Sequence, residues 1–387
     1  MRIAVFDLYV YLLFFSLFKA YFIPDALRQF IKIITLFLIL MFLLKRLKKK
    51  DIFNFSLLFS SVVIISGLYN YILDSYTTKA LLDSLLYALT FYDLYSIFLY
   101  AKKNGFITRV SNNLYRANLL YCLLTIVSVL VVGVENNSNV SAYLFGNKFT
   151  SSYLFIMLIA LYGFTHNMNR KKNKIRICLL VVIGCIFTVY VGCGTATVAL
   201  VTAVLVFFIG KSTKLRVIQS PIVVVSIIMG TAIIPFVINA ILKIDVVRYI
   251  IFDIFHRSIT VYGRFEIYNK YLYDLLCNKF WLGYGYSNGV MMSVSGVFGN
   301  AQNGLLEQMM NFGFIGGIAI LVLVFYALRK KKELSYMLIL LYAMIVAAIF
   351  EVTINWFFWI AVFSIQWLEK QRGEINEKSD NFIDATS

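Results

Sequence analysis

The stretch GNAQNGLLEQMMNFGFIGG, residues 299–317, places amides and a carboxylate directly before an apolar run that is spaced by glycines. Residues 304–328 are long and apolar enough to cross the roughly 30 Å hydrocarbon core of a bilayer as one helix. Asn303, Glu307 and Asn311 follow one another at intervals of four residues, so they share one face of that helix. Glu307 then lies about one turn inside the hydrophobic region, where an ionisable side chain is a candidate for function.

Similar apolar runs recur along most of the 387-residue chain, which is 61% hydrophobic and only 14% charged. A soluble domain carries roughly 25% charged residues. We therefore expect an all-α, polytopic integral membrane protein, a helical bundle with about twelve transmembrane helices. The expected spans lie near residues 4–20, 29–44, 52–72, 80–100, 116–134, 151–168, 175–191, 194–210, 220–242, 304–328, 334–350 and 353–369.

The formal net charge of +17 is gathered in short basic clusters between these spans. This is the positive-inside pattern of a membrane protein, and it argues against a nucleic-acid partner. Cytoplasmic connections are expected at residues 45–51, 101–116, 169–176, 210–216 and 329–333. Connections with few basic residues are expected outside, at residues 73–79, 135–150, 191–194 and 350–353. The alternation places both termini in the cytoplasm, and we expect a multi-pass protein of the inner (cytoplasmic) membrane that contacts membrane lipids.

One connection is far longer than the others. The chain divides into transmembrane helices one to nine (1–242), a large extracytoplasmic loop (243–303), transmembrane helices ten to twelve (304–369) and a polar cytoplasmic tail (370–387). Long loops within a compact protein usually carry function. Residues 263–281 of this loop space their apolar side chains as an amphipathic helix does, at Phe265, Tyr268, Leu272, Leu275 and Leu276.

The large loop carries four side chains that suit a phosphorylated substrate, namely Arg248, His256, Arg257 and Arg264. Arginine presents a planar fork that binds phosphate oxygens in pairs, and several arginines around one cavity would hold a pyrophosphate as it leaves. His256 supplies an imidazole base on the same side. The alternative is that these groups are solvated loop charges or contacts to lipid headgroups. With two histidines and no metal-ligand spacing of Cys and His, we expect neither a metal nor a cofactor.

The polar and glycine residues inside the spans have both structural and functional readings. Glu307 is either a general base that accepts a proton from a substrate hydroxyl, or a residue that caps the helix start or pairs with an arginine. Gly313 and Gly317 form a small-xxx-small pair, which predicts close packing against another helix. Asp83 lies near the outer end of its span, so we expect Glu307→Gln to be more damaging than Asp83→Asn. Asp93 lies deeper and should matter if a substrate or an ion passes through the protein.

Four motifs follow one another in the last third of the chain. They are YGRFEIY (262–268), NKFWLGYGYSNG (278–289), AQNGLL (301–306) and GFIGG (313–317). Each motif is loose alone, but the ordered set resembles the signature of the O-antigen ligase/polymerase superfamily. The remainder of the chain resembles that superfamily only in its expected topology, about twelve spans with one dominant outer loop late in the chain.

The resemblance implies a fold and a reaction. The fold is a GT-C-like membrane bundle, and the activity is that of a metal-independent glycosyltransferase, most like a Wzy-type polymerase of O-antigen, capsule or exopolysaccharide repeat units. The implied donor is a glycan on undecaprenyl pyrophosphate, and the implied acceptor is the terminal sugar hydroxyl of a second lipid-linked repeat. A chain-length regulator and a flippase are the implied protein partners.

The resemblance also implies residue roles and alternatives. The ligases of the superfamily carry a histidine where Gln302 stands, which favours a polymerase, because glutamine orients a hydroxyl but cannot take its proton. An O-antigen ligase-type transfer, a lipid-linked oligosaccharide flippase or other transporter, and a scaffold without chemistry are the alternatives. The implied roles are pyrophosphate binding by Arg264 and Arg257, with Arg248 a further substrate-binding candidate, activation of the hydroxyl by Glu307 or His256, and orientation of sugars by Gln302 and Asn303.

Overall fold

The computed structural model describes residues 2–18, 20–73, 77–134, 143–166, 168, 170–212, 216–241, 244–245, 266–329 and 334–368. Regular structure in these ranges is helical, and they contain no strand. The principal helices are α1 (Arg2–Leu17), α2 (Asp25–Arg46), α4 (Phe55–Ile72), α5 (Thr78–Lys103), α6 (Ile107–Val132), α7 (Lys148–Thr165), α8 (Lys171–Tyr190), α9 (Gly194–Ser212), α10 (Pro221–Ile241), α15 (Gly304–Leu328), α16 (Met337–Ala347) and α17 (Trp356–Leu368). Short helices are α3 (Lys49–Ile52), η2 (Arg216–Gln219), η4 (Ile267–Leu272), α13 (Tyr273–Asn278) and α14 (Val290–Ser295).

A helix lies at each of the predicted spans. Eight of them, α2, α4 to α9 and α15, are long and apolar enough to cross a membrane. Shorter apolar helices occupy the four other positions, within α1, α10, α16 and α17. The predicted class is confirmed, because the chain is a polytopic helical membrane protein.

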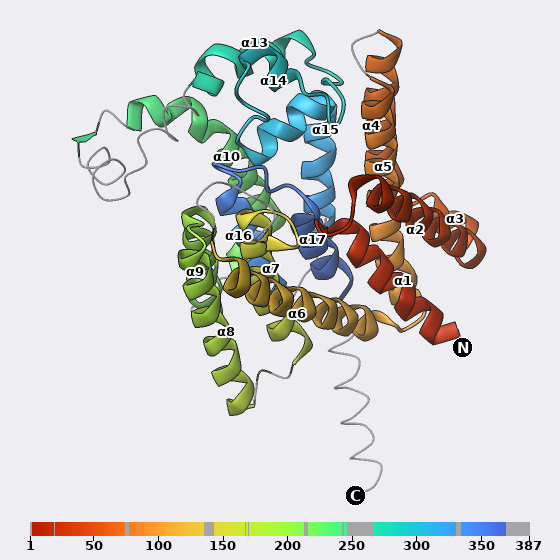
Figure 1. The fold of residues 1–387 in the computed structure, drawn as a ribbon, viewed down its shortest axis with the longest axis vertical. Helices are drawn as coiled ribbons and strands as arrows, with labels where there is room; N and C mark the ends of the chain where they lie inside the picture. The colour runs from red at the N-terminus through yellow and green to blue at the C-terminus, as the bar shows by residue number, and fades with distance from the viewer. Residues whose placement is uncertain are drawn as a thin grey trace, which may run out of the picture.

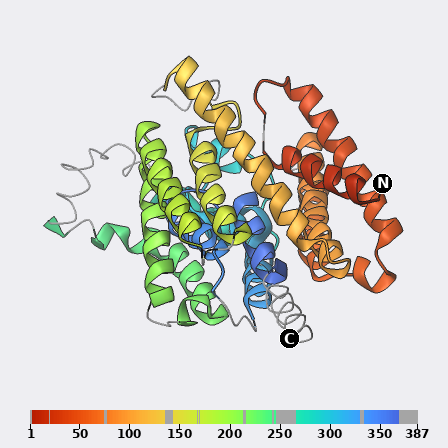
Figure 2. The same cartoon turned by 90° about the horizontal axis from the view of Figure 1, so that it is seen from below.

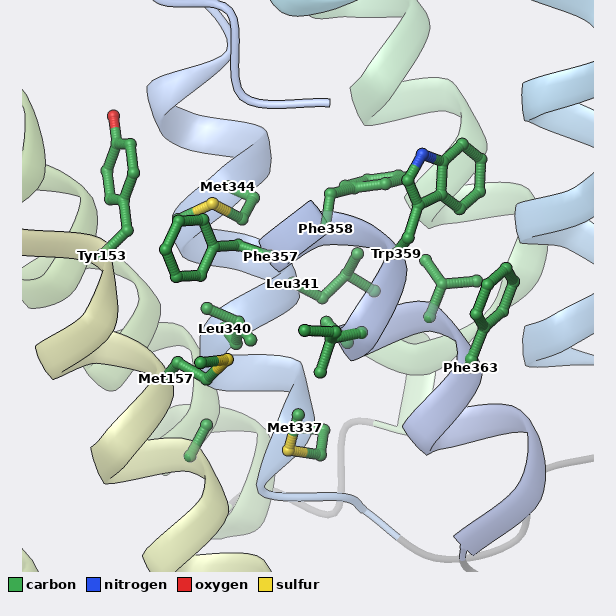
Figure 3. Close-up of a cluster of buried hydrophobic side chains, with 14 of the residues drawn as sticks. Tyr153, Met157, Met337, Leu340, Leu341, Met344, Phe357, Phe358, Trp359 and Phe363 are labelled. Carbon is green, nitrogen blue, oxygen red and sulfur yellow. The ribbon is translucent and has the colours of Figure 1, made fainter. Parts of the chain in front are cut away.

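The centre of the bundle is built from α5, α7, α16 and α17. The apolar window of α5 is 78% buried and that of α7 is 72% buried, whereas α2 and α8 are each only 22% buried. Figure 3 shows how Met157 of α7, Met344 of α16 and Trp359 of α17 fill the space between these central helices. The large apolar side chains exposed on α2, such as Phe30 and Phe37, therefore suit contact with lipid chains.

Helix α6 connects the two sides of the bundle. It packs against α1 on one side and against α7 on the other, and it also contacts α5 and α17. Figure 2 shows it running across the molecule between the first helices of the chain and the group that includes α7 to α10. Some polar groups that remain inside join neighbouring helices; for example, the amide of Asn118 in α6 donates to the carbonyl of Leu154 in α7 at 2.9 Å.

Connections that are rich in lysine and arginine contact one another. Lys103, at the end of α5, forms an ion pair with Asp51 in the connection between α2 and α4. Lys211, near the end of α9, donates to the hydroxyl of Tyr336, just before α16, at 3.1 Å. Each of these contacts joins two connections that the charge pattern assigns to the same side.

The connections with few basic residues also contact one another, at the other end of these helices. The backbone N–H of Gly304, at the start of α15, donates to the carbonyl of Ala348 in the α16–α17 turn at 2.8 Å. The backbone N–H of Tyr286 donates to Oγ of Ser84, near the start of α5, at 3.2 Å. We call this the basic-poor end of the bundle. In Figure 1, α13 and α14 lie over the start of α15 at this end, with the upper part of α4 beside them.

The described part of the long connection, residues 266–303, is named the connecting segment below. It begins with η4 and α13, whose buried side chains include Ile267, Tyr268, Leu272 and Leu275. These residues form a small apolar cluster with Met310 of α15 and do not join the main core. Within the predicted amphipathic segment, the described residues are helical over 267–278, as η4 followed directly by α13, with one apolar face buried.

Helix α15 is interrupted at Gly313, which has a φ of 67° and a ψ of −170°. This conformation is almost confined to glycine. The interruption frees backbone groups that a continuous helix would pair internally. The N–H of Phe314 donates to the carbonyl of Phe280 at 2.7 Å, and that of Ile315 donates to the carbonyl of Trp281 at 3.3 Å. The connecting segment thus satisfies the amides on one side of the break.

The carbonyls on the other side of the break are satisfied by the same segment. The N–H of Tyr284 donates to the carbonyl of Met310 at 2.9 Å, and the N–H of Gly285 donates to that of Asn311 at 2.7 Å. Oγ of Ser66 on α4 also donates to the carbonyl of Asn311 at 3.1 Å. Residues 280–285 therefore replace one turn of helical hydrogen bonds, inside a region where water cannot do so.

The helix–helix contact predicted from the two glycines is wrong. A Cβ on Gly313 would lie 2.2 Å from the carbonyl oxygen of Trp281, which belongs to the connecting segment. A Cβ on Gly317 would lie 3.0 Å from Cγ of Met309 in the same helix. Gly283, with a φ of 64°, approaches the break from the other side, where a Cβ would lie 2.5 Å from the nitrogen of Gly313. The glycines permit backbone-to-backbone contact between a loop and a broken helix.

Replacing Gly313 with alanine is expected to destabilise the protein by about 2–5 kcal/mol, from the disfavoured backbone conformation and the overlap with Trp281. The measurement is the free energy of unfolding in mixed detergent micelles. Gly299→Ala is the matched control, because a Cβ at Gly299 meets no atom within 4 Å. Equal stability of the two variants would mean that α15 is continuous in the membrane.

Candidate functional site

The four loop residues expected to bind phosphate or act as a base lie outside the described residues. They are Arg248, His256, Arg257 and Arg264. The structure does describe the other three candidates, Gln302, Asn303 and Glu307, which lie around the start of α15 at the basic-poor end.

Glu307 is half-buried in the first turn of α15, and both of its carboxylate oxygens are engaged. Oε2 accepts from the backbone N–H of Ala301 at 2.8 Å, and Oε1 accepts from Nδ2 of Asn311 at 3.3 Å. The first bond joins Glu307 to Ala301, which lies before the helix. The contact with the helix start, one of the alternatives for Glu307 in the sequence analysis, is therefore present. A carboxylate is favoured there by the helix dipole as well.

Asn303 has a structural role in this fold. It is the N-cap of α15, with Oδ1 accepting from the N–H of Leu306 at 3.1 Å. Its Nδ2 donates to the carbonyls of Thr231 at 2.9 Å and Ile349 at 3.3 Å, joining α15 to α10 and to the α16–α17 turn. The side chain is 0% exposed, so we do not include it among the groups that contact a substrate.

Gln302 lies in the loop just before this cap and remains half-exposed. Its backbone has a φ of 50°, which is uncommon for a residue with a side chain. Nε2 donates to Oδ1 of Asn300 at 2.8 Å, and the backbone carbonyl accepts from the hydroxyl of Tyr268 at 2.9 Å. The side-chain amide of Gln302 is therefore fixed by Asn300 and remains accessible, next to Ala301, whose N–H donates to Glu307.

A chain of polar side chains runs from Glu307 into the connecting segment. Asn311 donates to Glu307, and its Oδ1 accepts from Nδ2 of Asn288 at 2.9 Å. Oδ1 of Asn288 in turn accepts from the N–H of Val290, at the start of α14, at 2.8 Å. The chain couples the side chains of α15 to the loop that fills its break.

Aromatic rings lie beside this polar chain. The ring of Tyr286 stacks on that of Tyr87 in α5, with centroids 4.4 Å apart. Tyr87 also contacts Trp356 at 4.9 Å and Phe312 of α15 at 5.8 Å. Tyr286 and Trp356 are half-buried, whereas Tyr87 and Phe312 are buried. We call these four residues the aromatic floor, because its partly exposed members present ring surface at the basic-poor end.

Two carboxylates act on the phenol of Tyr286. Burial, together with the negative charges of Asp83 and Glu307, raises the pKa of Tyr286 to about 12. The phenol therefore keeps its proton at physiological pH and is available as a hydrogen-bond donor. Asp83 is half-exposed and precedes Ser84, the residue that accepts from the N–H of Tyr286. Helix α5, the connecting segment and α15 thus contribute to one site.

Lys279 supplies a positive charge at the edge of the connecting segment. Its ammonium donates to Oδ1 of Asn70 and lies 5.2 Å from the ring centre of Tyr284 and 6.0 Å from that of Tyr69. Partial burial lowers the pKa of Lys279, because loss of water penalises the charged form. Asn70 is itself fixed, since its Nδ2 donates to the carbonyl of Gly283 at 3.0 Å. The arrangement suits a phosphate oxygen.

Two further observations bear on the chemistry. Across the described ranges, no three His, Cys, Asp or Glu side chains lie close enough together to hold a metal ion. Asp93 is 0% exposed in α5, and neither of its oxygens has a hydrogen-bond partner in the part of the chain that the structure describes. No hydrogen bond in the described ranges joins Asp93 to the site at the basic-poor end.

Sequence reasoning found Glu307, Gln302 and Asn311 but missed Tyr286, Asn288 and Lys279, and it ranked Asp83 low. Tyr286 and Asn288 lie in the quoted GYGYSNG motif, where glycine spacing indicates only a turn. No local pattern brings the charge of Asp83 near Tyr286, because that proximity depends on the packing of α5 against the connecting segment.

The chain matches no protein-family model, no curated protein and no solved structure at a significant level. Its function is therefore argued from the site itself.

Replacing Asn311 with alanine is expected to destabilise the protein by about 1–3 kcal/mol, because Glu307 and Asn288 would each lose a hydrogen-bond partner. The measurement is again unfolding in mixed micelles. Asn104→Ala serves as control, since Asn104 is an exposed amide after α5 whose loss should change stability by about 0.5 kcal/mol or less. If both variants lost the same small amount, the polar chain would not stabilise the site.

Proposed function

We propose that this chain is a polysaccharide polymerase of the Wzy type. It would join undecaprenyl-pyrophosphate-linked oligosaccharide repeat units into surface polysaccharide on the outer face of the cytoplasmic membrane. The observation that carries the proposal is the site at the basic-poor end, where two carboxylates, three amides and an aromatic floor converge beside the segment that leads from Arg264.

The chemistry of the site suits a glycan. Carboxylate and amide oxygens accept hydrogen bonds from sugar hydroxyls, and amide N–H groups donate to them. The half-buried rings of Tyr286 and Trp356 offer apolar faces on which the C–H side of a sugar can stack, with a polar group at each ring edge. A site for a small apolar ligand would need fewer polar groups than this.

In the proposed reaction, the acceptor hydroxyl attacks the anomeric carbon of the donor. The bond from that carbon to the lipid pyrophosphate breaks, and a carboxylate or imidazole takes the hydroxyl proton. From the sequence, Glu307 and His256 are the candidates for this base. Arg264 and Arg257 would stabilise the charge on the departing pyrophosphate, as a clamp that needs no metal.

The topology that accompanies this function has twelve crossings, both termini in the cytoplasm, a GT-C-like bundle and one large extracytoplasmic loop. Its support is the segregation of basic and basic-poor connections to opposite ends of the described helices. Donor and acceptor would both reach the site from the outer leaflet, because the connecting segment lies at the basic-poor end.

Two alternatives use the same lipid-linked glycan. An O-antigen ligase would transfer the finished glycan to another acceptor, and a flippase would move the repeat unit across the membrane. Deleting the gene in its host and running the surface polysaccharide on a gel separates them. Loss of a polymerase leaves single repeats without a ladder, loss of a ligase leaves full-length polymer on its lipid, and loss of a flippase leaves no extracytoplasmic repeat.

Arg264→Ala is expected to abolish the polysaccharide ladder while the protein still reaches the membrane, because the departing pyrophosphate loses its clamp. The readouts are the gel and an immunoblot of the membrane fraction. Lys270→Ala is the matched control, since Lys270 is an exposed cation of the same loop that pairs with Glu266 at 2.8 Å. A normal ladder in the Arg264 variant would refute the pyrophosphate clamp.

The orientation is tested with Cys277, an exposed cysteine of the connecting segment. A membrane-impermeant maleimide added to spheroplasts is expected to label the wild-type protein but not the Cys277→Ser variant. Labelling that appears only after the membrane is opened would put the connecting segment in the cytoplasm. No acceptor in the outer leaflet could then reach the site.

A further inference from the structure

The two carboxylates beside Tyr286 differ in what they already bind. Both oxygens of Glu307 accept from protein donors, the N–H of Ala301 and Nδ2 of Asn311. Asp83 is half-exposed and takes part in no hydrogen bond or ion pair with the rest of the described chain. Of the two, Asp83 is the carboxylate with an oxygen to offer a substrate.

The position of Asp83 places it at the rim of the aromatic floor. It lies in the second turn of α5, one residue before Ser84, whose Oγ accepts from the backbone N–H of Tyr286. Four residues further along the same helix, and so on the same face, Tyr87 stacks on the ring of Tyr286. A sugar lying on the exposed side of Tyr286 would therefore meet Asp83 at the ring edge.

The two carboxylates also differ in what a proton would disturb. A proton on Glu307 must occupy an oxygen that already receives an N–H donor, which would weaken a contact holding the start of α15. Asp83 makes no such contact within the described ranges, so its use as a base would break none there. The negative charges of both carboxylates act on Tyr286, after burial, in the direction that raises its pKa.

We infer that Asp83 is the general base of the proposed glycosyl transfer, and that Glu307 is a positioning residue that holds the loop before α15 and the side chain of Asn311. This inference rests on the proposed function, and it reverses the ranking of the two carboxylates expected from sequence. Oδ of Asp83 takes the proton of the acceptor hydroxyl as the sugar oxygen bonds to the anomeric carbon. The electron pair of the broken carbon–oxygen bond leaves with the lipid pyrophosphate.

The test is turnover by the full-length protein in lipid nanodiscs. The substrate is the lipid-linked repeat unit extracted from a host strain that lacks this protein, and the product is polymer. Asp83→Asn is expected to lower kcat by about 10²- to 10⁴-fold, with KM changed by less than about threefold, because general-base catalysis contributes about this much to rate. Its thermal midpoint should match the wild type.

Four further variants separate catalysis from structure. Asp83→Glu should recover part of the lost rate, because it restores a carboxylate. Formate should restore part of the rate of Asp83→Ala but not that of Asp83→Asn, where the amide fills the space. Glu307→Gln should lower the thermal midpoint and the activity together. Asp274→Asn, at an exposed carboxylate of α13, should leave both at wild-type values.

The failures are distinguishable. Asp83→Asn with at least half the wild-type turnover would overturn the assignment of the base and leave the polymerase standing. A fall in its thermal midpoint equal to that of Glu307→Gln, with a proportional loss of rate, would make Asp83 structural and overturn the assignment as well. Wild-type protein that forms no polymer from this substrate would overturn both the polymerase and its base.

Discussion

Within a bilayer, a backbone N–H or C=O that loses its helical partner must find another inside the protein. The break in α15 is possible because residues 280–285 supply both kinds of partner, carbonyls for Phe314 and Ile315 and amides for Met310 and Asn311. The connecting segment is therefore part of the helical bundle and does not merely cover it. We call the contact of residues 280–285 with the break in α15 the loop-in-helix junction, and the site lies beside it.

The site follows from the junction, because the same residues build both. The backbone carbonyl of Asn311 accepts hydrogen bonds from Gly285 and Ser66. Its side chain donates to Glu307 and accepts from Asn288, so this one residue joins the break to the polar chain. Anything that shifts the loop must also shift the carboxylate and the amides. A site organised in this way is rigid where it meets the bundle, which suits the orientation of two reacting sugars.

Hydropathy predicted the helices well, since a helix lies at each expected span and an amphipathic helix lies where the loop pattern indicated one. The i, i+4 spacing also placed Glu307 and Asn311 in contact. The function of Gly313 was misread, because its partner is a loop backbone thirty residues earlier in the chain and no local pattern reveals such a contact. The proximity of Asp83 to Tyr286 could not be predicted for the same reason. The binding of pyrophosphate by Arg248, Arg257 and Arg264 stays a prediction, because these residues lie outside the described ranges.

The mutual approach of Gly283 and Gly313 has an evolutionary consequence. A side chain on Gly283 would overlap the backbone nitrogen of Gly313, and a side chain on Gly313 would overlap the backbone of Trp281 and Leu282, so neither glycine can be replaced without relaxing the junction. In chains that descend from a common ancestor with this one, the two glycines should be kept or lost as a pair. Residues 292–299 hold no group of the site and are mostly exposed, so this is the stretch where lineages with different glycans would diverge in length.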